Sequence, residues 1–140
     1  MTFKLSVEDA QALMDASPFV SFLGLKMTSA DAETGSVTMT MPMRPELERG
    51  GPMKGQFHGG PVASLIDTVG DFAVALAVGG TVPTMNFRID YLRPSSGEVL
   101  TATAQARRIG RTVAVVDIDV LDDQNRLCAV GRGTYSAVIG

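Results

Sequence analysis

The stretch GQFHGGPVASLIDTVGDF, residues 55–72, holds the only histidine of the chain, a Gly-Gly-Pro step and two aspartates in an otherwise uncharged run. Pro61 suits the first position of a helix, and Gly79 followed by Gly80 suits its end. We therefore predict a helix over residues 61–78. Its aliphatic residues recur at helical spacing and form one stripe, which comprises Val62, Leu65, Ile66, Val69, Ala73 and Leu76.

The opposite face of this helix carries small residues and the two aspartates rather than a mixture of charges. Between Lys54 and Arg88 there is no Lys, Arg or Glu, whereas a solvated helix face normally carries several. We therefore expect both faces to be covered, and we expect a second subunit to supply the cover over this face. The face comprises Ala63, Ser64, Asp67, Asp71, Val74 and Ala75.

The rest of the chain predicts an antiparallel sheet. Ser6 and Asp9 have the spacing of a capping box and open a short amphipathic helix over residues 6–15. Residues 25–43 alternate like a hairpin, and the three glycines and two prolines of residues 44–57 predict a loop. Four strand-like stretches follow, joined by short turns, and predict an antiparallel meander: 82–94, 97–110, 111–123 and 124–139. The chain, residues 1–140, is thus expected to be a single α+β domain with one sheet against one long helix.

Composition excludes several classes of function. With 45% hydrophobic residues, 19% charged residues and a net charge of -3, the chain is globular and offers no basic surface for nucleic acid. A single cysteine, Cys128, and a single histidine argue against a disulfide framework and a metal site, and we expect Cys128 to be a buried thiol in a strand. The N-terminus lacks the pattern of a signal peptide and no apolar run fits a membrane span, so we expect a cytoplasmic protein.

Asp67 and the Gly-Gly step are the candidates for chemistry, whereas we expect Asp71, one turn further on, to be an interface or solvent-facing residue. Asp67 is either a catalytic group or a structural acceptor or interface residue, because an unpaired carboxylate on a covered face is costly. Gly59 and Gly60 let a ligand approach the free N–H groups at the start of the helix, which can bind an oxyanion or a polarised carbonyl. His58 and Asp67 lie roughly 13 Å apart along a helix. If both belong to one site, Asp67 must come from an antiparallel helix of a second subunit, which implies a dimer with two composite sites.

The segment FHGGPVASLIDT resembles a known motif, a His-Gly-Gly step with an aspartate nine residues after the histidine. This motif is found in hotdog-fold acyl-CoA thioesterases of the PaaI-like (phenylacetate-pathway) family, and the resemblance runs over about residues 17–138. It implies a central helix wrapped by a curved antiparallel sheet, with active sites across a dimer interface and often a tetramer. The implied substrate is an acyl-CoA, and no cofactor other than the CoA of the substrate is implied.

The resemblance also implies roles for individual residues. Asp67 corresponds to the family's nucleophile or general base, Gly59 to the N–H donor that polarises the thioester carbonyl, and His58 to the residue that orients it. Thr84 stands where the family commonly has a hydroxyl that positions water or the carboxylate. The remaining candidates for substrate binding are Gly60, Gln56 and the segment at Arg107, Gly110, Arg111 and Thr112, which either borders the CoA nucleotide or is a basic hairpin turn.

One position departs from the family pattern. Many relatives have an asparagine six residues before the motif histidine, where this chain has Pro52, and Gln56 is the nearest amide that could replace it. Two other functions therefore stay open: a hotdog hydratase or dehydratase acting on acyl thioesters, and an acyl-CoA-binding protein without catalysis. Candidates to line the acyl pocket are Met41, Met53, Phe57 and Phe72, although methionines at strand spacing are also typical of plain core.

Overall fold

The computed structural model describes all 140 residues, and its centre is the long helix α3, Gly59–Val78. The helix begins two residues earlier than predicted, because His58 is its N-cap and accepts a hydrogen bond from the Gly60 N–H (3.4 Å). It ends at Gly79, which adopts a left-handed conformation with φ +95°. All six residues of the predicted aliphatic stripe are buried, so that prediction is confirmed.

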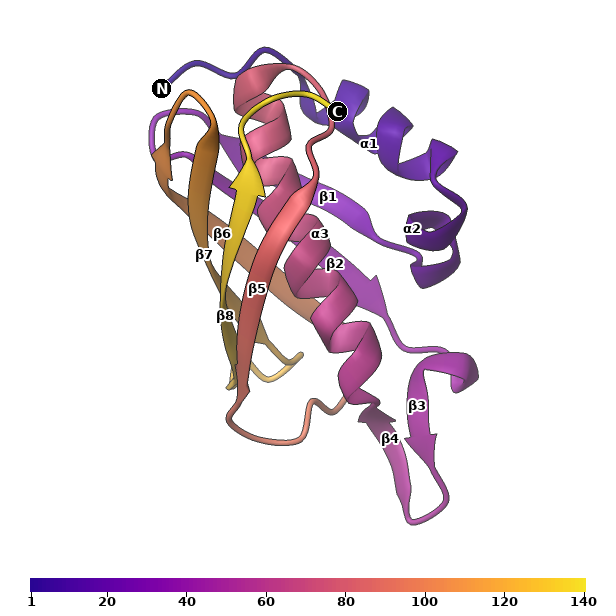
Figure 1. Ribbon diagram of the computed structural model, residues 1–140. Helices are drawn as coiled ribbons and strands as arrows, with labels where there is room; N and C mark the ends of the chain where they lie inside the picture. The colour runs from indigo at the N-terminus through magenta and orange to yellow at the C-terminus, as the bar shows by residue number, and fades with distance from the viewer.

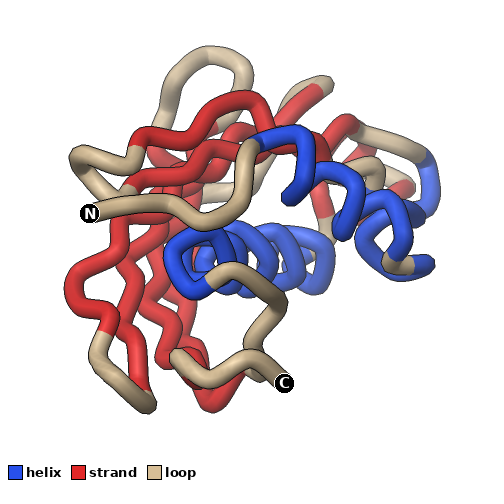
Figure 2. The backbone as a smooth tube through the Cα atoms, turned by 90° about the horizontal axis from the view of Figure 1, so that it is seen from above, coloured by secondary structure: helices blue, strands red, loops and turns tan.

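A six-stranded antiparallel sheet curves around one side of α3 (Figures 1 and 2). Its order is β1-β2-β6-β7-β8-β5. The strands are β1 (Lys26–Asp31), β2 (Ser36–Pro42), β5 (Thr84–Tyr91), β6 (Val99–Ile109), β7 (Val113–Leu121) and β8 (Leu127–Ser136). The predicted hairpin and all four later strands are therefore present, and the α+β class is confirmed.

The prediction of a four-strand meander is wrong for β5. Only β6, β7 and β8 follow one another in the sheet, whereas β5 pairs with β8 and forms the edge. The connection from β5 to β6 is not a tight turn, because it is held against an earlier part of the chain. Gln56 bridges to Ser96, and the Gly97 N–H donates to the Gly55 carbonyl (3.1 Å). These contacts join segments about 40 residues apart, which local patterning does not reveal.

Helix α3 packs against the sheet through a close contact with β8. Tyr135 is fully buried on β8 and its hydroxyl donates to the Asp67 backbone carbonyl (3.1 Å). A Cβ at Gly70 would lie 2.1 Å from this hydroxyl oxygen, and one at Gly133 would lie 2.4 Å from it. Both glycines are therefore required for α3 to lie this close to β8. Cys128 on β8 is a buried free thiol, as predicted.

Two short helices precede the sheet. Helix α1, Val7–Ala16, begins at Ser6 with the predicted capping box to Asp9. Helix α2, Pro18–Leu23, was not predicted, although its ends follow standard chemistry. Ser17 caps its start and Gly24, with φ +69°, ends it. At only six residues, α2 is too short to show an amphipathic period.

Residues 44–57 are ordered structure rather than the predicted loop. They form a short 3-10 helix, η1 (Pro45–Leu47), and a hairpin of β3 (Glu48–Gly50) and β4 (Met53–Phe57). Gly50 and Gly51 have positive φ and make the turn of this hairpin, in which Pro52 also lies. The hairpin projects from the end of the molecule where α3 begins (Figure 1). The glycines and prolines that suggested a loop are thus the turn residues of a small second sheet.

Part of the second face of α3 is already buried within the chain, and the cover that a second subunit would give to the rest stays a prediction. Val74 and Ala75 are fully buried, and the Lys4 and Leu5 N–H groups donate to the Leu76 carbonyl (2.7 and 3.3 Å). By contrast, the face around Asp67 and the first turns of α3 remains partly exposed. By length and composition alone α3 could span a membrane, but its apolar character is that of a core helix with half of its residues buried.

Candidate active site

The first turn of α3 presents a backbone N–H that no group in the chain accepts. Gly59 is the first helical residue, and its N–H lies outside both the helical ladder and the other hydrogen bonds of the backbone. His58 uses its ring to bind the Gly60 N–H, and its own N–H donates to the Leu47 carbonyl (2.8 Å). The structure therefore leaves the Gly59 N–H free at the positive end of the helix dipole.

A cavity of about 370 Å³ opens beside this N–H. Gly59 and Tyr91 both line it, and the Tyr91 hydroxyl donates to the Gly59 carbonyl (2.7 Å). Arg49 and Arg93 also line it and bring positive charge. These three residues are not predicted by the sequence. They come from β3, from the end of β5 and from the segment after it, and a polar residue near the end of a strand does not by itself indicate a functional site.

Asp67 lies two turns further along α3 and is held by a residue of β5. The Thr84 hydroxyl donates to Asp67 Oδ1 (2.7 Å), so the structure brings together two of the predicted site residues. Burial raises the pKa of Asp67, and the Thr84 hydrogen bond partly opposes this rise. The carboxylate is therefore fixed in orientation and more basic than an exposed aspartate, which suits either a nucleophile or a general base.

A second cavity, of about 290 Å³, lies next to Asp67. Its far wall comes from α1 and α2 and includes Phe19 and Val20, while the near wall is α3 with Asp67, Asp71 and Phe72. The structure thus places Asp71 in the same cavity as Asp67, whereas the sequence suggested only an interface or solvent-facing residue. Burial, followed by the nearby charge of Asp67, raises the pKa of Asp71 to about 7.

This shift predicts a pH dependence of stability. Because the pKa of Asp71 is higher in the folded protein than in the unfolded chain, the folded protein binds more protons between about pH 4 and pH 7. Ionisation of Asp71 therefore lowers the free energy of unfolding as the pH rises through this range. Asp71→Asn keeps an acceptor for the Val82 N–H and removes the charge. We expect it to raise the free energy of unfolding at pH 8 by about 2 kcal/mol, a value reduced for solvent screening.

Urea unfolding of wild type and Asp71→Asn at pH 5 and pH 8, at one protein concentration, measures this effect. We expect the stability gain of the variant to be larger at pH 8 than at pH 5. An equal gain at both pH values would show that Asp71 does not titrate in this range.

Other predicted residues lie outside these two cavities. Gln56 does not line either cavity, and its side-chain oxygen accepts a hydrogen bond (2.9 Å) from Arg49, which lines the Gly59 cavity. Met41 is buried in the core and Met53 lies exposed on the hairpin, whereas Phe57 lines the Gly59 cavity and Phe72 the Asp67 cavity. Of the four proposed pocket residues, only the two phenylalanines therefore face a candidate site.

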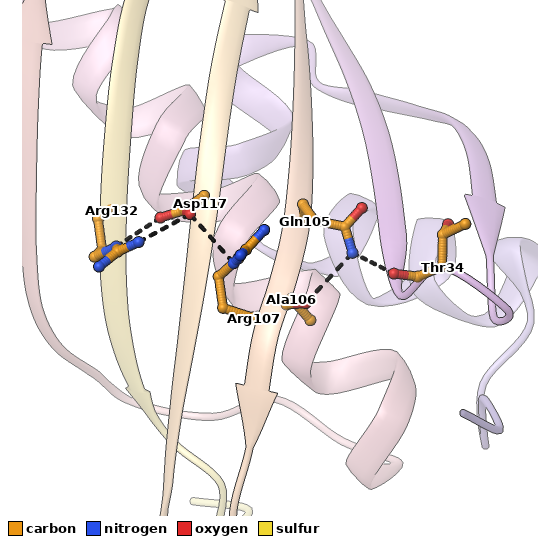
Figure 3. A network of polar contacts seen from close by, with 6 residues as sticks. All are labelled: Thr34, Gln105, Ala106, Arg107, Asp117 and Arg132. Atoms are coloured by element: carbon orange, nitrogen blue, oxygen red, sulfur yellow. Dashed lines mark hydrogen bonds and ion pairs between the residues drawn. The ribbon is translucent and has the colours of Figure 1, made fainter.

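The basic segment at the β6–β7 turn also lies apart from both cavities of the same chain. Arg107 forms an ion pair with Asp117 (3.6 Å), which is also bound by Arg132 (2.6 Å), on the outer face of the sheet (Figure 3). Gly110, Arg111 and Thr112 form the turn at the end of the sheet opposite to the N-terminus of α3 (Figure 1). None of these residues lines the Gly59 or the Asp67 cavity. Their role in binding CoA stays a prediction.

Comparison with known proteins identifies the family. The family model described as Thioesterase superfamily matches residues 54–129, which contain the Gly59 N–H, Asp67 and strands β5 to β7. The chain belongs to the Thioesterase superfamily. The predicted resemblance, the hotdog fold and the class of enzyme, a thioester hydrolase, are all confirmed at this level.

Individual superfamily members resemble the chain along most of its length. It is 33% identical over 135 residues to the acyl-coenzyme A thioesterase PaaI of Escherichia coli, covering 95% of this chain and 91% of PaaI. The structure of E. coli PaaI superposes with a TM-score of 0.81 at 30% identity, covering 95% of this chain and 93% of that one. A thioesterase from Haemophilus influenzae superposes with a TM-score of 0.85 at 29% identity, covering 97% and 94% of the two chains.

Proposed function

We propose that this superfamily member hydrolyses acyl- or aroyl-CoA thioesters to the free acid and CoA, with Asp67 as the reacting carboxylate. The relative PaaI is named as an acyl-CoA thioesterase, which supports this substrate class. The observation that carries the proposal is the placement of two complementary groups at opposite ends of one edge strand. The hydroxyl of Thr84, at the start of β5, donates a hydrogen bond to the Asp67 carboxylate, and the hydroxyl of Tyr91, at the end of β5, donates one to the Gly59 carbonyl.

This placement supports a site shared between two subunits. Strand β5 is an edge of the sheet and exposes large apolar side chains, including Met85 (60% exposed) and Tyr91 (52% exposed), so it is a ready surface for strand pairing. If two β5 strands pair antiparallel about a two-fold axis, the start of one lies beside the end of the other. Asp67 of one subunit then approaches the Gly59 N–H of its partner, and the dimer has two composite sites.

The chemistry follows from these two groups. The Gly59 N–H donates to the thioester carbonyl oxygen and stabilises the charge that develops on it, which is worth ~3 kcal/mol for one donor. Asp67 either attacks the carbonyl carbon or removes a proton from the water that attacks it. In both routes the carbon–sulfur bond breaks and CoA leaves as a thiolate. In the first route this leaves a mixed anhydride between the acyl group and Asp67, which water then hydrolyses to the free acid and the free Asp67 carboxylate. Single-turnover hydrolysis in ¹⁸O-water identifies the nucleophilic route when ¹⁸O enters the Asp67 carboxylate, because water must then have attacked the Asp67 carbon of a mixed anhydride, whereas general-base catalysis places ¹⁸O only in the product acid.

Positive charge beside the Gly59 cavity suits a substrate that carries phosphates. Arg49 and Arg93 line that cavity, and the arginine-containing turn at residues 110–112 is a further candidate. In a dimer with antiparallel helices, this turn approaches the partner's site rather than its own. The CoA nucleotide is accordingly proposed to lie along these basic residues rather than in the cavity beside Asp67.

A panel of CoA thioesters tests the proposed function. Purified wild type is mixed with butyryl-, octanoyl-, benzoyl- and phenylacetyl-CoA, and thiol release is followed with a thiol-reactive dye. We expect hydrolysis of at least one member. An enoyl-CoA is tested in parallel by loss of its conjugated absorbance, and hydration without thiol release would favour the hydratase alternative. Binding of acyl-CoA without either reaction would favour a non-catalytic binding protein.

A further inference from the structure

Two exposed phenylalanines lie on the six-residue helix α2, and one of them makes a cation–π contact. Phe19 is 57% exposed and Phe22 is 48% exposed. The Arg44 guanidinium lies over the Phe22 ring, 4.5 Å from its centroid, and also donates to the Phe22 carbonyl. The contact with Arg44 therefore accounts for the exposed ring of Phe22. Phe19 instead lines the cavity that contains Asp67.

The place of Phe19 in this cavity relates it to the acyl group. This step rests on the proposed function, in which Asp67 reacts at the thioester carbonyl carbon. That carbon bears both the acyl chain and the sulfur of CoA. Arginines line the Gly59 cavity, which suits the phosphates of CoA, so the acyl group is placed in the cavity beside Asp67, where no basic residue lies. The wall across from α3 comes from α1 and α2, and Leu13, Phe19 and Val20 give it an apolar surface.

Helix α2, which forms part of this wall, is capped at both ends and tied to a later segment of the chain. The Ser17 hydroxyl accepts a hydrogen bond from the Val20 N–H (3.3 Å), and the Gly24 N–H donates to the Ser21 carbonyl (3.1 Å), so both ends of the helix are closed. Arg44 ties the helix to the segment after β2 through the Phe22 carbonyl. A fixed wall excludes groups that are too long, whereas a mobile wall would adapt to them.

We infer that Phe19 sets the upper length of the acyl group that this enzyme accepts. The substrate class that fits a cavity of about 290 Å³ bounded on one side by Phe19 is a short to medium acyl, or single-ring aroyl, thioester. Removal of the phenyl ring opens the cavity toward solvent along α2. A larger ring at the same position shortens it.

The test measures a ratio of specificities rather than a total rate. For straight-chain thioesters, kcat/KM for decanoyl-CoA is divided by kcat/KM for butyryl-CoA. We expect Phe19→Ala to raise this ratio at least ~10-fold, since each methylene accommodated in an apolar pocket changes kcat/KM by about that factor or more. Phe19→Trp should lower the same ratio. Phe22→Ala is the matched control: it removes a similarly exposed ring from the same helix, keeps the backbone bond to Arg44, and should leave the ratio unchanged.

Each pattern of results decides a different point. An unchanged ratio in both Phe19 variants, or an equal shift in Phe22→Ala, overturns the inference while leaving the proposed function standing. A wild type that hydrolyses no thioester overturns both. If Phe19→Ala lowers kcat/KM for all chain lengths equally and sedimentation shows dissociated subunits, Phe19 is an interface residue and the inference is wrong.

Discussion

Asp67→Asn is expected to lower kcat for acyl-CoA hydrolysis by about three orders of magnitude, within the range of ~10²–10⁴ that removal of a positioned base or acid costs. Asparagine has nearly the same shape and can still accept the Thr84 hydrogen bond that holds Asp67 in place. The change therefore removes the basic oxygen and leaves the geometry. Thiol release under substrate saturation measures the loss, and thermal unfolding verifies that the variant is folded.

Asp71→Asn serves as the matched control for this result. Asp71 lies one turn further along the same face of α3 and lines the same cavity, so the control makes the same carboxyl-to-amide change in the same surroundings. We expect its kcat to stay within about tenfold of the wild-type value. Comparable losses in the two variants would mean that the cavity needs negative charge in general and would remove the special role of Asp67.

Gly59→Pro is expected to lower kcat by ~10²–10³-fold, because it deletes the one N–H that stabilises the developing oxyanion. The substitution suits the backbone at this point. Proline is tolerated in the first turn of a helix, and His58 before it already has φ -64° and ψ 153°, the conformation that a residue preceding proline prefers.

Gly59→Ala separates loss of the N–H from loss of space. Its Cβ would lie 3.4 Å from the Tyr91 hydroxyl oxygen, an ordinary contact, and the N–H would remain. We expect Gly59→Ala to retain most of the kcat that Gly59→Pro loses. If alanine were as damaging as proline, the glycine would serve close approach of the substrate rather than hydrogen bonding to it.

Local patterns were sufficient to predict most elements of the fold. Helix α3 was predicted from the spacing of Val62, Leu65 and Ile66, and its end from Gly79, because burial against one sheet imposes a 3.6-residue period. The strands alternate with a period of two for the same reason. Asp67 stood out because a carboxylate among small uncharged residues has an energetic cost that calls for a use or a partner.

The features that complete the site depend on contacts between distant segments. The edge position of β5 follows from its pairing with β8 and from the anchoring of Ser96 beside Gln56, and neither contact leaves a local signal. The sequence of residues 48–57 predicts a loop rather than a hairpin, because the short strands are rich in residues typical of turns. Tyr91 could not be assigned to Gly59, since 32 residues separate them in the chain. Part of the wall of the cavity beside Asp67 likewise comes from α2, a helix too short to show a helical period in the sequence.

Mixing Asp67→Ala subunits with Gly59→Pro subunits tests the composite site most directly. In a mixed dimer, one site has the intact Gly59 N–H of the first subunit and the intact Asp67 of the second, while the other site has lost both. Random reassociation of equal amounts makes about half of the dimers mixed, so we expect about a quarter of wild-type thiol release from two nearly inactive parents. Mixed dimers that are verified by differential tags and still show no activity above that of the parents would contradict the account.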